Sequence, residues 1–156
     1  MPALFLALTG CASIPDAVRS LPNDVSTELD GTPFFPQERF QCGPAALTTT
    51  LLASGADVRL DDIVDAVFLP GKEGSLQLEL VAAARRYDRL PYVIDGTLAA
   101  IQAELEAGRP VLVLQNLGVA AIPRWHYAVV VGIDAENQDV VLRSGTERRH
   151  ETPIMT

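Results

Sequence analysis

Residues 36–46 have the sequence Pro-Gln-Glu-Arg-Phe-Gln-Cys-Gly-Pro-Ala-Ala, in which an extended segment passes into a helix. Pro36 favours an extended conformation for the residue before it. Pro44 fits the first helical turn, where the N–H that proline lacks would have no partner. Small and apolar residues then continue until Gly55, a residue type that often ends helices. We therefore predict a helix that begins near Cys42 and ends just before Gly55.

The rest of the chain divides into helical and strand-like segments. Further helices are predicted over residues 60–67, 76–87 and 98–107, and strands over residues 91–94, 110–114, 127–133 and 139–143. Ser75 and Thr97 are of the residue types that cap helix N-termini, and residues 134–138 are expected to join the last two strands as a hairpin. Helices come first and antiparallel strands later. This order predicts an α+β fold, with N-terminal helices packed on a C-terminal antiparallel sheet.

The composition is that of one globular domain. The chain has 156 residues, of which 48% are hydrophobic, and this is enough apolar material to close a core. Its formal net charge of −8, without a basic stripe, argues against a nucleic-acid partner and against electrostatic docking on anionic lipid. The 2 cysteines are too few for a disulfide scaffold, and no Cys/His spacing suits a metal. We therefore expect neither a metal nor a cofactor.

The N-terminal residues resemble the sorting signal of a bacterial lipoprotein. Residues 1–8 are apolar but too few to span a bilayer as a helix. They lead into Leu8-Thr9-Gly10-Cys11, which resembles a lipobox, and this resemblance implies that Cys11 carries the lipid and becomes the new N-terminus. Ala12, rather than an aspartate, follows the cysteine, which in such lipoproteins favours the outer membrane with the protein facing the periplasm. Multiple acyl chains would give stable anchoring.

This signal sets the predicted domain organisation. Residues 1–11 form the lipoprotein signal, residues 12–32 a tether that combines prolines, serines and aspartates with little periodicity, and residues 33–156 the folded domain. No Lys or Arg precedes the apolar run, so either the natural start is upstream of Met1 or the gene model is trimmed. At the other end the chain stops where a further strand is expected. This favours the interpretation that the sequence is the front part of a longer protein.

Four residues together carry the chemistry that a thiol nucleophile needs. A cysteine is reactive as the thiolate, and Cys42 lies at a helix N-terminus, where the dipole and the free N–H groups stabilise an anion. Gly43 leaves room for a carbonyl group to approach. Gln37 can donate to an oxyanion together with the backbone N–H of Cys42. His126, at the start of a predicted strand, can take the proton of the thiol and return it.

These residues stand in two blocks that resemble the double-glycine leader peptidase family of papain-like cysteine peptidases, and more closely its stand-alone bacterial members with a lipoprotein signal. The blocks are Gln37-x-x-x-x-Cys42-Gly43-Pro44-Ala45-Ala46-Leu47 and His126-Tyr127-Ala128-Val129-Val130-Val131-Gly132, and the resemblance covers residues 34–145. It implies a papain-like α+β fold and hydrolysis of a peptide or isopeptide bond, through a thioester, in a peptide or protein substrate. It further implies Cys42 as nucleophile, His126 as base and Gln37 as the oxyanion residue.

The chain departs from that family at the residue that orients the base. In the family an aspartate on the next strand orients the imidazole. Here, counting residues outward from the predicted hairpin turn places Ser144 across from His126. A serine hydroxyl or a backbone carbonyl can hold the ring without supplying charge, and Asp139 and Asn116 remain alternatives. The spacing from Gln to Cys is also slightly shorter than in the family. This sequence contains no P-loop or membrane helix of the family's fused transporter, so the family's substrate is not carried over.

Less specific explanations apply to each residue taken alone. Cys42 is also consistent with a small buried residue, and His126 with a core histidine whose hydrogen bonds are satisfied. A Cys11–Cys42 disulfide is a further alternative in an oxidising compartment, which lipidation of Cys11 would exclude. His150 and the two arginines before it are expected to form a solvated charged run.

Two other functions remain open beside the peptidase. The same nucleophile would serve an acyl transferase that forms an amide, if an amine rather than water accepts the acyl group. The missing acidic partner of His126 instead favours a catalytically impaired module that binds a peptide in the cleft. The set formed by Gln37, Cys42 and His126 favours the peptidase over both.

Overall fold

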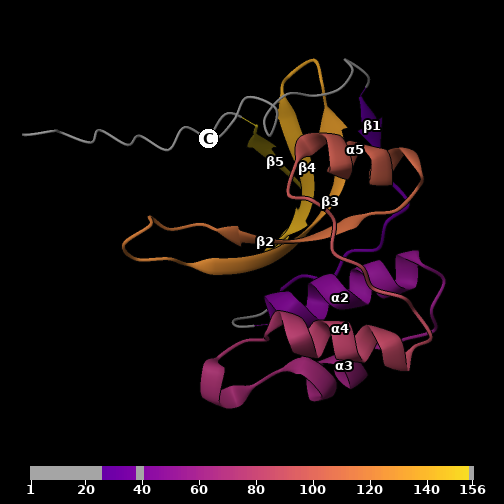
Figure 1. The fold of residues 1–156 in the computed structure, drawn as a ribbon, viewed down its shortest axis with the longest axis vertical. Coiled ribbons are helices and arrows are strands. Elements are labelled where there is room, and N and C mark those ends of the chain that lie inside the picture. Colours follow the sequence, from indigo (N-terminus) through magenta and orange to yellow (C-terminus); the bar gives the residue numbers. More distant parts are fainter. Residues whose placement is uncertain (1–25, 38–40, 155–156) are drawn as a thin grey trace, which may run out of the picture.

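The computed structural model describes residues 26–37 and 41–154 of the chain. Cys11, the predicted signal and most of the predicted tether lie outside these residues. The described elements are β1 (Thr27–Glu28), α2 (Cys42–Ala53), α3 (Leu60–Val67), the 3-10 helix η1 (Pro70–Lys72), α4 (Gln77–Arg86), α5 (Leu98–Glu106), β2 (Val111–Asn116), β3 (Trp125–Asp134), β4 (Asp139–Ser144) and β5 (Glu147–Pro153). Helices and a curled antiparallel sheet confirm the predicted α+β class (Figure 1). Within the described residues, no helix has the length and apolarity that crossing a membrane requires.

All strand pairs in the sheet are antiparallel. The order is β1-β3-β4-β5, and β2 pairs with the part of β3 that β1 leaves open. The side chains of β3, the central strand, alternate between two cores. Val129 and Val131 pack with α2, α3 and α4 in one buried cluster, whereas Ala128 and Val130 pack with α5 in the other. Burial on both faces explains why β3 is a continuous apolar run.

The helices begin and end close to the predicted residues. α2 and α3 have the predicted bounds, and α4 and α5 are slightly shorter than predicted. Thr97 caps α5 as predicted, because its Oγ1 accepts a hydrogen bond from Ala100 N at 3.1 Å. The predicted Ser75 cap of α4 is wrong: Leu76 is the N-cap residue and makes no side-chain cap hydrogen bond. The Ser75 hydroxyl is buried instead, without a partner among the described residues.

The structure corrects the strand prediction in two places. Residues 91–94, predicted as a strand, have no strand structure, and Tyr92 and Val93 there are 58% and 78% exposed. β5 was not predicted, and it includes His150 and the arginines that were expected to form a solvated run. Its backbone pairs with β4 while most of its side chains stay exposed, as is usual for an edge strand.

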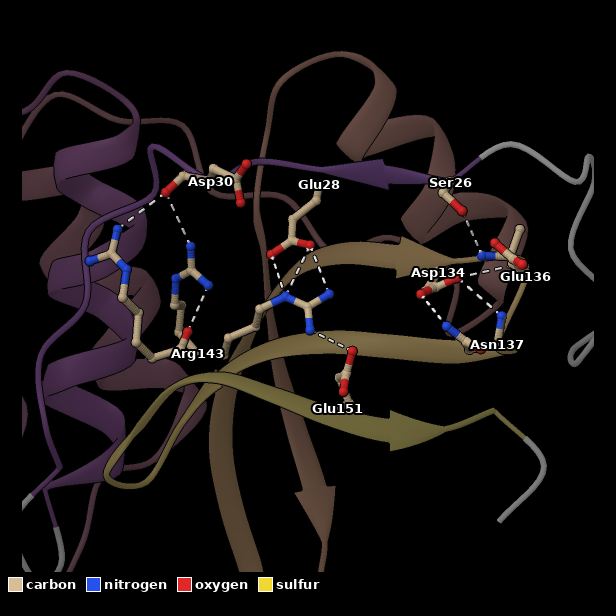
Figure 2. A network of polar contacts seen from close by, with 11 residues as sticks. Ser26, Glu28, Asp30, Asp134, Glu136, Asn137, Arg143 and Glu151 are labelled. Carbon is tan, nitrogen blue, oxygen red and sulfur yellow. Dashed lines mark hydrogen bonds and ion pairs between the residues drawn. The ribbon is translucent and has the colours of Figure 1, made fainter.

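Residues 26–32, which belong to the predicted tether, pack against the sheet. Their strand β1 pairs with β3. Glu28 of β1 also forms an ion pair with Arg149 of β5 at 3.1 Å, because the curl of the sheet brings the two strands near each other (Figure 2). Thr32 is only 5% exposed. The folded part of the chain therefore extends upstream of residue 33.

The side chain of Arg143 fastens this segment to β4 and β5. Its guanidinium donates to the carbonyl oxygens of Asp30, Thr32 and Arg148, at 3.3, 3.4 and 2.6 Å. Arg148 also donates to Asp30 O at 3.2 Å, so two cations hold the same carbonyl group (Figure 2). Burial, followed by the charge of Arg148, lowers the pKa of Arg143. The group nevertheless stays protonated, because arginine is by far the weakest acid among cationic side chains.

Candidate active site

One cleft brings together Gln37, Cys42 and His126, the residues that the sequence analysis proposed for catalysis. It has a volume of about 290 Å³. Its lining residues are Gln37, Cys42, Glu73, Arg124, Trp125, His126 and Gly145. A larger hollow of about 440 Å³ beside α3 contains the carboxyl groups of Asp61 and Asp65 but no thiol or imidazole. Among the described residues, no three His, Cys, Asp or Glu side chains are grouped so as to hold a metal ion.

Cys42 is the first residue of α2 and is partly buried. The helix N-terminus places backbone N–H groups and the positive end of the helix dipole beside the thiol. Packing, rather than substrate access, explains the glycine that follows. A Cβ on Gly43 would lie 2.7 Å from Ser75 Cβ and 3.5 Å from Tyr127 Cδ2. Ser75 and Tyr127 thus fill the space beside Gly43 and fix the start of the helix against β3.

His126 lies near the start of β3, and its side chain is half-buried. Its Nε2 atom is 3.0 Å from Ser144 Oγ. Because Val129 pairs with Arg143, Ser144 lies one step further toward His126, and its hydroxyl reaches the imidazole diagonally across the ladder. When Nε2 carries the proton and donates to Ser144, Nδ1 has the lone pair that a general base needs.

The two alternative partners of His126 have other positions or contacts. Asp139 lies at the opposite end of β3, where it pairs with Asp134. The Oδ1 atom of Asn116 accepts hydrogen bonds from two backbone N–H groups of the β2–β3 turn, at 3.0 and 2.9 Å. Ser144 is the side chain that the described structure places on the His126 ring.

Gln37 is held in the cleft by β3 and by the turn after β4. Its backbone N donates to Gly145 O at 2.9 Å, and Gly145 N donates to Gln37 Oε1 at 3.1 Å. Its Nε2 donates to Tyr127 O over a long 3.4 Å. A side-chain amide has two N–H groups, so one remains for a further acceptor in the cleft. Gly145 has a φ of +56°, a conformation that favours glycine at this turn.

Some cleft residues were not predicted. A Ser-Gly pair after a strand is a turn signal, so Gly145 could have been found as a turn residue, although not as the partner of Gln37. Glu73 and Arg124 come from the end of η1 and from the β2–β3 turn, and only the tertiary fold brings them to the cleft. Residues 38–40, which complete the motif around Cys42, lie outside the described residues.

Burial favours the neutral form of His126. It is the main cause that lowers the pKa of His126, and the charge of His150 lowers it further. The neighbouring Tyr127 has a raised pKa, mainly because of burial and then because of the charges of Cys42 and Glu79. The His126 imidazole should therefore remain able to accept a proton at pH values where a free histidine is largely charged.

We expect the His126 pKa, measured by NMR titration, to lie below the value of about 6.5 of an unperturbed histidine. The chain has 2 histidines, so a His150→Ala variant assigns the ring signals, and it should also raise the His126 pKa by removing a charge. Because the unfolded chain binds this proton more tightly, the group destabilises the fold as the pH falls below about 6.5 and has no such effect well above it. A His126 pKa above 6.5 would contradict this account and would indicate pairing with a Cys42 thiolate.

A family model matches most of the chain. The model described as Peptidase_C39 like family matches residues 29–152, a span that includes Gln37, Cys42, His126 and Ser144. No curated protein and no solved structure matches the chain.

Proposed function

This chain belongs to the Peptidase_C39 like family, and from that premise we propose that it is a cysteine peptidase that hydrolyses a peptide or isopeptide bond. The family suggests cysteine peptidase activity, and the helices and curled antiparallel sheet fit a papain-like fold. The observation that carries the proposal is the cleft that Gln37, Cys42 and His126 line together. A thiol, an imidazole and an amide donor are the groups that acyl transfer to sulfur requires.

In the proposed reaction, His126 takes the proton of the Cys42 thiol as the sulfur begins its attack. In the tautomer in which Nε2–H donates to Ser144, Nδ1 acts as the base. The sulfur attacks the substrate carbonyl carbon, and the electron pair of the C=O π bond moves to the oxygen. The backbone N–H of Cys42 and the remaining N–H of the Gln37 amide donate to this oxyanion.

The tetrahedral intermediate then collapses. The C–N bond breaks while the His126 imidazolium gives its proton to the departing amine, which leaves a thioester on Cys42. Water next gives a proton to His126 and attacks the thioester carbon. The C–S bond breaks, the carboxylic acid product leaves, and the Cys42 sulfur recovers the proton from His126. Each proton that the imidazole accepts is thus returned, and water is the only co-reactant.

The neutral partner of His126 affects the equilibrium between the neutral thiol–imidazole pair and the thiolate–imidazolium ion pair. A carboxylate would stabilise the imidazolium, whereas Ser144 orients the ring by a hydrogen bond alone. Burial acts in the same direction, because it also disfavours the charged ring. We therefore expect the proton to pass from sulfur to nitrogen largely during the attack, rather than to form a stable ion pair beforehand.

We also propose that the protein is of the stand-alone lipoprotein type, with a lipid on Cys11 and the domain facing the periplasm. The support is the Leu8-Thr9-Gly10-Cys11 motif, which lies outside the described residues. The substrate would then be a peptide or protein of the cell envelope. Mass spectrometry of protein isolated from membranes decides this point, and an unmodified Cys11 thiol would argue against the anchor.

Acylation by an activated ester tests the Cys42–His126 pair without knowledge of the substrate. In a Cys11→Ser background, in which Cys42 is the remaining cysteine, 4-nitrophenyl acetate should acetylate Cys42 and release nitrophenolate in a rapid burst. A His126→Ala variant should lose this burst by about a hundredfold or more, because general-base assistance is gone. Ser144→Ala should cause a smaller loss, since it affects only the orientation of the ring.

Thermal unfolding shows whether each variant is folded, and peptide mapping shows whether the acetyl group is on Cys42. Slow acetylation that is independent of His126 would contradict the peptidase proposal. That result would favour the alternative in which the cleft binds a peptide without cleaving it.

A further inference from the structure

The β2–β3 hairpin forms an arm that projects from the body of the domain. The arm comprises residues 114–126, and its tip, residues 117–124, lies away from the helices and from β4 and β5 (Figure 1). Large apolar side chains along the arm are exposed: Leu114 46%, Leu117 58%, Val119 66%, Ile122 71% and Trp125 63%. Apolar side chains that gather on one protrusion indicate a surface that meets a partner.

The tip is a tightly built turn. Its hydrogen bonds join Leu117 N to Arg124 O, Ile122 N to Val119 O, and both Gly118 N and Arg124 N to Asn116 Oδ1. A Cβ on Gly118 would collide with Ile122 O, so the turn closes too tightly for a larger residue. Pro123 has no N–H to satisfy. Four backbone N–H groups of the tip are therefore satisfied within the turn, which lowers the cost of entering an apolar medium, where unpaired N–H groups are costly.

The arm contains no acidic residue. Between Val111 and Ile133, Arg124 is the only charged side chain apart from the titratable His126, in a chain with 20 Asp and Glu residues against 12 Lys and Arg. Among the described residues, Arg124 takes part in no ion pair. The net negative charge of the whole chain opposes electrostatic docking on a membrane, but the arm can enter an apolar layer without carrying a carboxylate with it.

From these observations we propose that the tip of the arm inserts into the surface of a lipid bilayer. Val119 and Ile122, which pair at the end of the turn, enter the acyl region. Leu117 and Arg124 bond to each other across the arm one step nearer the body of the domain, and Trp125 follows them. Tryptophan and arginine side chains favour the headgroup level there. A peptide that added to the tip as a strand would need a row of unpaired backbone groups there, whereas four N–H groups of the tip already bond within the turn.

This docking is a property of the arm and goes beyond the proposed peptidase reaction. It depends neither on Cys42 nor on a lipid at Cys11. Arg124 and Trp125 also line the cleft. An inserted tip would therefore hold the mouth of the cleft at the membrane surface, and peptides close to the bilayer would be the ones that reach it.

The chain has 1 tryptophan, Trp125, so intrinsic fluorescence reports directly on the base of the arm. Full-length protein carrying Cys11→Ser, which removes the thiol that would bear a lipid, should sediment with phosphatidylcholine vesicles. Its emission should shift to the blue and should be quenched by brominated phosphatidylcholine. Ile122→Asp should lower the partition coefficient at least about tenfold, because a carboxylate would have to enter the apolar layer.

Val93→Asp is the matched control, because Val93 is 78% exposed, as against 71% for Ile122, and lies between α4 and α5 rather than on the arm. It should leave the partition coefficient unchanged. Residues 1–8 are present in every variant, so vesicle binding that they cause would persist in Ile122→Asp and would overturn the proposal. Wild-type emission that brominated lipid does not quench would also overturn it, whether or not the variants fold.

Two further results would assign the arm to another partner and would equally overturn the proposal. A blue shift that appears without vesicles and grows with protein concentration would indicate a second copy of this chain. A shift that needs an added peptide, and does not occur with vesicles, would indicate that the arm binds substrate.

Discussion

Replacement of Cys42 by alanine is expected to abolish peptide hydrolysis, with kcat/KM reduced by at least about a thousandfold. The sulfur forms the covalent bond to the substrate, and none of the other residues that line the cleft carries a thiol or a hydroxyl group. Because the substrate is unknown, the measurement uses a complex peptide library, and mass spectrometry counts the new termini that wild-type and variant proteins produce.

Cys11→Ser is the matched control, because it removes the other cysteine and should leave hydrolysis unchanged. Cys42→Ser should be nearly as inactive as Cys42→Ala, since a hydroxyl group is a much weaker acid than a thiol and His126 cannot activate it as easily. Acid-quenched wild-type protein should carry an acyl group on Cys42 that hydroxylamine removes. New termini produced equally by Cys42→Ala would contradict the assignment of this thiol as the nucleophile.

The helices of this protein are predictable because their ends are marked by local signals. Pro44 stands in the first turn of α2, Gly55 follows its end with a φ of +79°, and Thr97 caps α5. Each signal acts over a few residues, so a single sequence contains it. β1 and β5 are different, because a strand at the edge of a sheet is defined by backbone pairing with distant residues while its side chains stay polar.

The residues of the candidate site also fall into those that local sequence signals reveal and those that only the tertiary fold brings together. Cys42 and His126 stand in recognisable blocks, and counting residues from the predicted hairpin turn was sufficient to bring Ser144 close to His126. The bond between Gln37 Oε1 and Gly145 N joins groups that are 108 residues apart, so it is a product of the tertiary fold. Local reasoning also assigned the space beside Gly43 to a substrate, where the fold places side chains that come from distant parts of the sequence.

The anchoring of residues 30–37 is the other part of the site that the sequence did not predict, and one buried cation contributes two of its hydrogen bonds. Arg143 is 3% exposed, and its guanidinium donates to three backbone carbonyl groups, two of them in this segment. The segment continues into Gln37, whose backbone and side chain both bond to Gly145. The contacts of Arg143 therefore support both the fold and the position of the proposed oxyanion donor.

Replacement of Arg143 by methionine is expected to lower the free energy of unfolding by about 2–4 kcal/mol. Methionine fills much of the same space but donates no hydrogen bond, so the carbonyl of the buried Thr32 loses a partner in a place that water reaches poorly. Urea unfolding should show a lower midpoint with an unchanged m-value, because the surface exposed on unfolding stays the same. The unfolding midpoint of Arg143→Lys should lie between those of the wild type and Arg143→Met. Lysine keeps the positive charge but lacks the several N–H donors of the planar guanidinium.

Arg149→Met on the adjacent strand is the matched control. The Arg149 side chain is 46% exposed and pairs with Glu28 and Glu151 at the surface. Ion pairs in water contribute little, so the same substitution there should lower the free energy of unfolding much less than Arg143→Met does. The difference between the two losses in the free energy of unfolding measures how much more an arginine stabilises the fold when it is buried and donates to backbone carbonyl groups. Equal losses would contradict this account, because they would show that the buried contacts of Arg143 contribute no more to stability than a surface ion pair does.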